Sequence, residues 1–154
     1  MFSINLDGHL IDVSKPTVMG ILNVTPDSFH DGGKYLSEHE LENRITQIVE
    51  QGATFIDIGA YSSRPGAEDV TEDDELQRLL PAVALVKNLY PSFPVSIDTF
   101  RSGVVKRLVQ THGPVIVNDI SAGELDAGML SVVGALKLPY IAMHMRGTPR
   151  TMQS

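Results

Sequence analysis

The chain has 154 residues, no cysteine and a formal net charge of −7. This length suffices for one domain with a hydrophobic core, and the lack of cysteine excludes disulfides and thiolate metal sites. The negative charge, without any cluster of Lys and Arg, argues against a nucleic-acid partner. No apolar run is long enough to span a bilayer, and the first residues lack the pattern of a signal peptide, so we expect a cytoplasmic protein without a membrane partner.

Residues 1–15 predict a β-hairpin. Apolar side chains alternate at Phe2, Ile4 and Leu6, and a turn-forming Asp7-Gly8 pair separates them from a second apolar stretch. A hairpin in front of a series of strands and helices would plug the bottom of a barrel.

Five short apolar runs then predict strands. The runs are continuous rather than alternating, which is typical of strands covered on both faces. They are TVMGILNV (17–24), ATFIDIGA (53–60), PVSIDT (94–99), PVIVNDI (114–120) and PYIAMHM (139–145).

Helical patterns lie between the runs. Ser37 and Glu40 form a capping box for the first helix, and Gly52 is a C-terminal stop. Thr71 opens a second helical pattern, in which Pro81 predicts a kink or a division into two helices.

Two further patterns, one through Val104, Val105, Leu108 and Val109 and one over 129–136, complete the alternation of strands and helices. The alternation predicts a parallel sheet with right-handed crossovers. A closed (β/α)₈ barrel needs about 250 residues, so the sheet is either open and doubly wound or an incomplete barrel. No linker divides the chain into two domains.

Polar side chains end four of the five runs: Asn23, Asp98, the pair Asn118-Asp119, and His144. Because ligands of parallel α/β sheets bind beyond the carboxyl ends of the strands, these residues predict a polar pocket at that edge.

Each of these residues also has a structural interpretation. Asp98 could cap the following helix, and Asp119 could bind neighbouring backbone. Asp57, inside its run, is more typical of a structural carboxylate, and His144 of a core or rim histidine. No zinc-site spacing occurs, and neither do the common nucleotide-binding or hydrolase motifs.

Two long loops follow the first two runs. TPDSFHDGG and YSSRPGAEDV each combine proline, glycine, hydroxyl groups and charge, which is typical of lids and binding loops. Phe29 favours a lid over a flat ligand, and the alternative is a pair of solvated surface loops.

The stretch MGILNVTPDSFHDGG closely resembles the first signature of the dihydropteroate synthase family, and SSRPGA resembles its second. SIDT, VNDI and MHMRGTPRTMQ continue the resemblance, which covers the chain from Val18 onward. It implies a (β/α)₈ barrel, of which residues 1–154 would be the N-terminal part, with about five βα units behind the hairpin.

The resemblance also implies an activity: condensation of dihydropterin diphosphate with 4-aminobenzoate, releasing diphosphate, in folate biosynthesis. Asp98 and Asn118 would bind the pterin, with Ser63 as a further substrate-binding residue. Asn23 would bind Mg²⁺, the implied cofactor, with help from Asp27.

The same resemblance assigns catalytic roles to four loop residues: Asp27, Phe29, Arg64 and Pro65. The reaction passes through a cation that water would capture, so loops of this kind would cover the site before the bond breaks. Phe29 and Pro65 would wall the 4-aminobenzoate pocket, the sulfonamide target of the family.

A chain with five of the eight units would lack the phosphate-binding loops after the last strands. We therefore expect no activity from this chain alone, and self-association through its open sheet edges, beyond the dimerisation of the full-length family. The alternatives are a pterin-binding methyltransferase domain, a non-catalytic pterin-binding module and an inert fragment. The TPDSF loop favours the synthase.

Overall fold

The computed structural model describes residues 2–25, 37–61 and 70–144. The predicted candidates Asp27, Phe29, Ser63, Arg64 and Pro65 lie outside these residues. In chain order the elements are β1 (Ser3–Leu6), β2 (His9–Asp12), β3 (Met19–Asn23), α1 (Glu38–Glu50), β4 (Phe55–Gly59), α2 (Glu72–Leu89), β5 (Val95–Asp98), α3 (Ser102–His112), β6 (Ile116–Asp119), α4 (Met129–Leu136) and β7 (Tyr140–Ala142).

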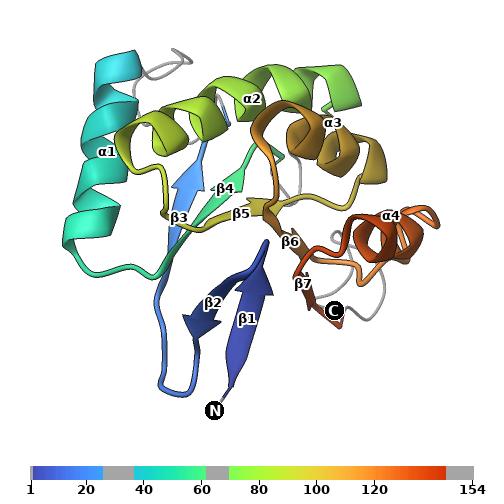
Figure 1. The fold of residues 1–154 in the computed structure, drawn as a ribbon. Coiled ribbons are helices and arrows are strands. Elements are labelled where there is room, and N and C mark those ends of the chain that lie inside the picture. The colour runs from blue at the N-terminus through green and yellow to red at the C-terminus, as the bar shows by residue number, and fades with distance from the viewer. Residues whose placement is uncertain (1, 26–36, 62–69, 145–154) are drawn as a thin grey trace, which may run out of the picture.

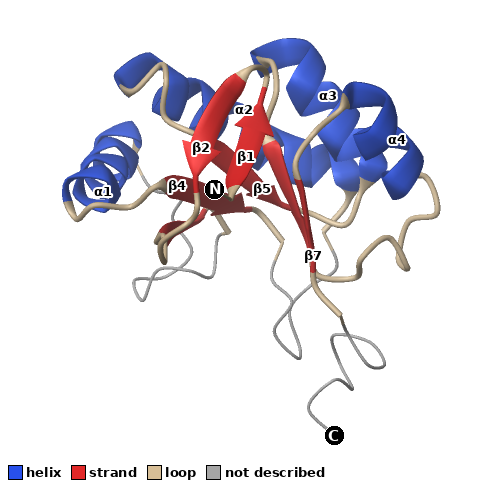
Figure 2. Cartoon of the chain, turned by 60° about the horizontal axis from the view of Figure 1, so that its bottom comes forward, coloured by secondary structure: helices blue, strands red, loops and turns tan. Residues whose placement is uncertain are grey.

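The sheet has the topology of a barrel wall. Strands β3 to β7 are parallel and lie side by side in sequence order. The four helices of the described residues all lie on one face of this sheet (Figures 1 and 2). A doubly wound sheet carries helices on both faces, so the α/β fold predicted as an incomplete (β/α)₈ barrel is confirmed and the doubly wound alternative is wrong.

The predicted N-terminal hairpin is present as the antiparallel pair β1 and β2. Its turn uses the left-handed backbone of Asp7 (φ 50°) and Gly8 (φ 86°), as an Asp-Gly hairpin turn requires. Ile4 and Val13 of the hairpin region line an apolar cavity of about 250 Å³ together with Phe55 at the start of β4. The role of the hairpin as a cap of the barrel bottom stays a prediction.

The predicted helix boundaries follow from local chemistry. The Ser37 hydroxyl accepts from the Glu40 amide and the Glu40 carboxylate accepts from the Ser37 amide, so the capping box of α1 is confirmed. Gly52 follows the end of α1 with φ +88°, the conformation that favours glycine there. Thr71 caps α2 by accepting from the Asp74 amide.

Of the two outcomes predicted for Pro81, division of the helix is wrong, and a kink stays a prediction. Pro81 does not divide α2, which runs unbroken over 18 residues. Proline leaves the Gln77 carbonyl without its helical donor, but Gln77 is exposed, so water can hydrate that carbonyl. The predicted fourth helix is present as α4.

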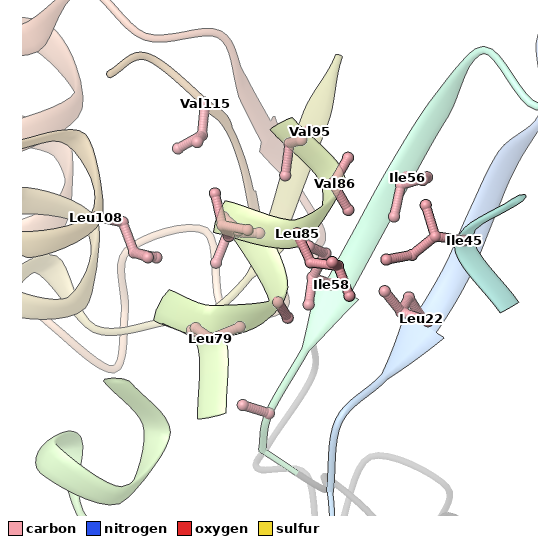
Figure 3. Packing of buried hydrophobic residues seen from close by; sticks show 14 of the residues in the cluster. Leu22, Ile45, Ile56, Ile58, Leu79, Leu85, Val86, Val95, Leu108 and Val115 are labelled. Carbon is pink, nitrogen blue, oxygen red and sulfur yellow. The ribbon is translucent and has the colours of Figure 1, made fainter. Parts of the chain in front are cut away.

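The core lies between the sheet and its helices (Figure 3). Leu22, Ile58 and Ile97 occupy one register row of β3, β4 and β5, and their side chains are at most 2% exposed. The next residues along these strands therefore point to the opposite, barrel-interior face. None of the helices that the structure describes is long and apolar enough to cross a membrane.

Candidate functional site

One register row joins the predicted ligand residues at the carboxyl end of the sheet. Asn23 pairs with Gly59, Gly59 with Asp98, and Asp98 with Asn118. Because paired residues of neighbouring strands point to the same face, the three polar side chains share the barrel-interior face. Asn23 is exposed, and Asp98 and Asn118 are partly buried.

Gly59 makes room for this arrangement. A methyl group on Gly59 would lie 3.4 Å from Asp98 Oδ2 and 3.5 Å from Asn23 Oδ1. The two oxygen atoms therefore approach the same point from either side of a residue that has no side chain. The row thus presents an amide oxygen and a carboxylate oxygen together above β4.

Asp57 belongs to this site, which the sequence did not indicate. Its Oδ2 accepts a hydrogen bond from Asn118 Nδ2 at 3.0 Å, which fixes the orientation of the amide. Asp57 is 6% exposed, and its Oδ1 has no hydrogen-bond partner within the described part of the chain. A buried carboxylate oxygen without a donor is costly, so this atom is open to a donor from a ligand.

The site concentrates negative charge. Burial, followed by the charges of Asp57, Glu75 and Asp119, raises the pKa of Asp98 from 3.8 to about 7. The Asp98 carboxyl accepts no hydrogen bond from the residues that the structure describes. Asp98 does not cap α3, whose N-cap is Arg101; the Ser102 amide donates instead to Asp126.

Asp119 has the structural role that its position allowed. The carboxylate accepts from the Ser121 amide and hydroxyl at 2.8 Å each, from the Gly123 amide at 2.9 Å and from the Tyr140 hydroxyl at 2.7 Å. It therefore closes the turn after β6 and holds β7 beside it.

His144 is exposed rather than part of the core.

Replacement of Asn118 by leucine is expected to lower the free energy of unfolding by about 1–3 kcal/mol. The substitution removes the donor to Asp57 Oδ2, so both oxygens of a buried carboxylate then lack a partner among the described residues. Urea denaturation at pH 8 measures the effect. The control is Asn88→Leu on the exposed side of α2, which should change the value by less than about 0.5 kcal/mol. An unchanged stability of Asn118→Leu would mean that the pair contributes nothing.

The sequence reasoning also missed an ion pair beside the site. Arg101, three residues after Asp98, donates to Glu75 in the first turn of α2 at 2.5 Å. Glu75 is 1% exposed. The signal was present, because a carboxylate on the buried face of a helix requires a cation.

The model of the pterin binding enzyme family matches residues 19–154 of this chain. Among curated proteins, the chain is 46% identical over 144 residues to the mitochondrial folate synthesis bifunctional protein of Arabidopsis thaliana, covering 92% of this chain and 26% of that protein. It is 42% identical to the dihydropteroate synthase of Haemophilus influenzae, covering 94% of this chain and 51% of the relative.

Solved structures give the same result. The dihydropteroate synthase of Yersinia pestis in a sulfonamide drug complex aligns with a TM-score of 0.86 at 37% identity, over 99% of this chain and 54% of that one. The Burkholderia cenocepacia enzyme complexed with 7,8-dihydropteroate aligns with a TM-score of 0.76 at 33% identity, over 97% and 49%. The chain therefore spans about half the length of the single-function synthases that it matches.

Proposed function

The chain belongs to the family of pterin-binding enzymes, and from that premise we propose that it carries the pterin-binding part of a dihydropteroate synthase, a transferase of folate biosynthesis. The observation that carries this proposal is the row of Asn23, Asp98 and Asn118 on one face of the sheet. The proposed reaction joins the methylene carbon of a dihydropterin diphosphate to the amine of 4-aminobenzoate, with diphosphate as the leaving group.

The donors and acceptors of the row match the rim of a pterin. That rim presents N–H donors and ring-nitrogen acceptors side by side. Asp98 and Asp57 Oδ1, which has no partner among the described residues, would accept from the N–H groups. Asn118 has an oxygen acceptor and an N–H donor. The hydrogen bond from Asn118 to Asp57 fixes the amide, so the amide oxygen keeps one orientation toward the ligand.

Asn23 is the proposed residue for Mg²⁺. Its amide oxygen is a hard ligand of the kind that Mg²⁺ prefers, and Mg²⁺ commonly binds only one or two protein groups together with substrate phosphates. Among the described residues no group of three or more His, Cys, Asp or Glu could hold a metal ion, which fits a site completed by substrate. Mg²⁺ bound there would neutralise charge on the diphosphate.

The side-chain chemistry of the predicted loop residues suits the remaining parts of the proposed reaction. Asp27 would assist Asn23, and Ser63 would hydrogen-bond substrate. Arg64 would contact anionic substrate groups, and Phe29 and Pro65 would enclose the aromatic ring of 4-aminobenzoate, where we expect sulfonamides to compete. Departure of diphosphate before attack by the amine leaves a stabilised cation, so the loops must exclude water.

Replacement of Asp98 by alanine is expected to weaken binding of the dihydropterin diphosphate at least about 100-fold, because one lost charged acceptor leaves ligand donors unpaired. Isothermal titration with the ligand and Mg²⁺ at pH 8 measures this. Wild-type binding should strengthen from pH 6 to pH 8, since the pKa of Asp98 is about 7 and the carboxylate forms across that range.

The control for this titration is Asp73→Ala, which removes an exposed carboxylate of α2 and should leave the affinity unchanged. A diphosphate-release assay with 4-aminobenzoate then separates the alternatives. Binding with release supports a complete synthase site in this chain, and binding without release supports a pterin-binding module, the result that we expect for the isolated chain. Absence of binding by the wild-type chain would refute the proposal.

We further propose a cytoplasmic, self-associating protein. Val18 and Ile21, at the edge strand β3, are each 60% exposed, and Ile141 on the opposite edge strand β7 is 37% exposed. Exposed apolar side chains beside unpaired strand edges favour association. Light scattering coupled to size-exclusion chromatography should give a mass above 16.8 kDa. A stable monomer would contradict this.

A further inference from the structure

The short turn between Asp98, the last residue of β5, and α3 contains an arginine with several contacts to distant parts of the chain. Arg101 is the N-cap residue of α3, and its side chain is 18% exposed. Its guanidinium donates through one terminal nitrogen to Glu75 Oε2 and through the other to the Val70 carbonyl oxygen at 2.6 Å. Two directed hydrogen bonds to different parts of the chain use the planar fork of an arginine.

Two aromatic rings complete the surroundings of this guanidinium. Its central carbon lies 5.3 Å from the centroid of the Tyr61 ring and 4.9 Å from that of the Phe100 ring. The two rings pack edge to face, with centroids 5.2 Å apart at 88°. Cation–π contacts of this geometry are attractive, and more so in a partly buried site.

The residues that Arg101 contacts lie just after β4 and at the start of α2. Tyr61 immediately precedes the segment 62–69, and Val70 immediately follows it. Glu75 lies in the first turn of α2, the helix that this segment enters. A single side chain thus touches the point where the chain leaves β4 and the point where it returns. Arg78 adds a hydrogen bond of 3.0 Å to the Ala60 carbonyl, one residue before Tyr61.

We propose that Arg101 is a positioning residue that fixes Tyr61, after β4, and Val70, before α2, against the strand end that carries Asp98. Arg101 and Asp98 share one short turn, so this contact sets the register between the two ends and the row of ligand residues. A role of this contact in ligand binding rests on the proposed function, whereas the anchoring of Tyr61 and Val70 by Arg101 does not.

Replacement of Arg101 by lysine distinguishes its contacts to Tyr61 and Val70 from its ion pair with Glu75. The ammonium of Arg101→Lys would still neutralise Glu75. It is a compact point charge without a planar fork, so it cannot reach Val70 at the same time or contact both rings as a planar group. The variant therefore keeps the buried ion pair and loses the ties to the two chain ends.

Hydrogen exchange of the whole chain, read by mass spectrometry, tests the proposal. In Arg101→Lys, the amides at Tyr61 and at 70–76 should exchange at least about 10-fold faster, with β6 amides unchanged, because local opening is governed by local contacts. The matched control is Arg107→Lys, on the exposed side of α3, which should leave all amides unchanged.

A second variant guards against misfolding of the first. Tyr61→Leu keeps the pair of Arg101 and Glu75 and removes one ring, so we expect a smaller acceleration, of roughly threefold, confined to the Tyr61 side. Unchanged exchange in both variants would overturn the proposal. A uniform acceleration across the sheet would also overturn it, since it would assign Arg101 to overall stability alone.

Calorimetric titration with the dihydropterin diphosphate distinguishes this proposal from the proposed function. If the wild-type chain binds no pterin, the proposed function fails, while accelerated exchange at the two ends still supports anchoring. If the wild type binds and exchange is unchanged in the variants, the anchoring proposal fails and the proposed function stands.

Discussion

Replacement of Asp98 by asparagine is expected to raise the free energy of unfolding at pH 8 by about 3 kcal/mol and to leave it nearly unchanged at pH 4. Burial and three neighbouring carboxylates raise the pKa of Asp98 from 3.8 to about 7. Each pKa unit corresponds to about 1.4 kcal/mol, and partial access to solvent reduces the full value. Asparagine resembles the protonated acid in shape and carries no charge.

Proton binding to Asp98 determines the direction in which the free energy of unfolding changes with pH. Between pH 4 and 7 the folded protein keeps the Asp98 proton and the unfolded chain loses it, so wild-type stability falls as the pH rises through this range. Above pH 7 both states are ionised and the loss is constant. The asparagine variant lacks this dependence, so its advantage over the wild type should develop between pH 4 and 7.

Urea denaturation at several pH values measures this effect. The control is Asp73→Asn, the same change at an exposed carboxylate of α2, which should shift the free energy by less than about 0.5 kcal/mol at either pH. An equal effect of Asp98→Asn at pH 4 and pH 8 would show that the charge of Asp98 is not the cause. The variant should also bind the dihydropterin diphosphate more weakly, since function commonly opposes stability at ligand sites.

Replacement of Arg101 by methionine is expected to lower the free energy of unfolding by about 3–5 kcal/mol at pH 7, because removal of one partner leaves a buried charge uncompensated. Glu75 is 1% exposed, and its Oε1 already lacks a hydrogen-bond partner within the described residues. Loss of the arginine therefore removes the only donor recorded for that carboxylate in the described part of the chain.

A double-mutant cycle isolates the interaction. Combining Arg101→Met with Glu75→Met should recover most of the lost stability, since an apolar pair of similar volume replaces a buried ion pair at little cost. Arg107→Met on the exposed side of α3 is the matched control, with an expected change below about 0.5 kcal/mol. Strictly additive effects of the two single changes would contradict a direct interaction.

The order and type of the elements could be predicted because their signals are local. The apolar runs, the Asp7-Gly8 turn and the capping box at Ser37 and Glu40 each depend on residues a few positions apart. The predicted division at Pro81 is wrong because the continuity of α2 depends on packing against the sheet along the rest of its length. Tertiary packing commonly overrides such a local preference.

The candidate site could be predicted only in outline. Polar residues at strand ends indicated Asn23, Asp98 and Asn118, because the ends of parallel strands meet at one edge. The sequence could not show that Gly59 separates the oxygens of Asn23 and Asp98, or that Asp57 orients Asn118. Both facts depend on the register between strands far apart in the chain.

By itself the sequence determined the hairpin, the alternation of strands and helices and the polar strand ends, since hydrophobic period and turn chemistry are properties of short segments. Only the tertiary structure decided which side chains meet: the amide of Asn118 with Asp57, and Arg101 with Glu75, Tyr61 and Val70. These contacts join residues 26 to 61 positions apart. Their geometry follows from the packing of α2 and α3 on a parallel sheet, which no local pattern encodes.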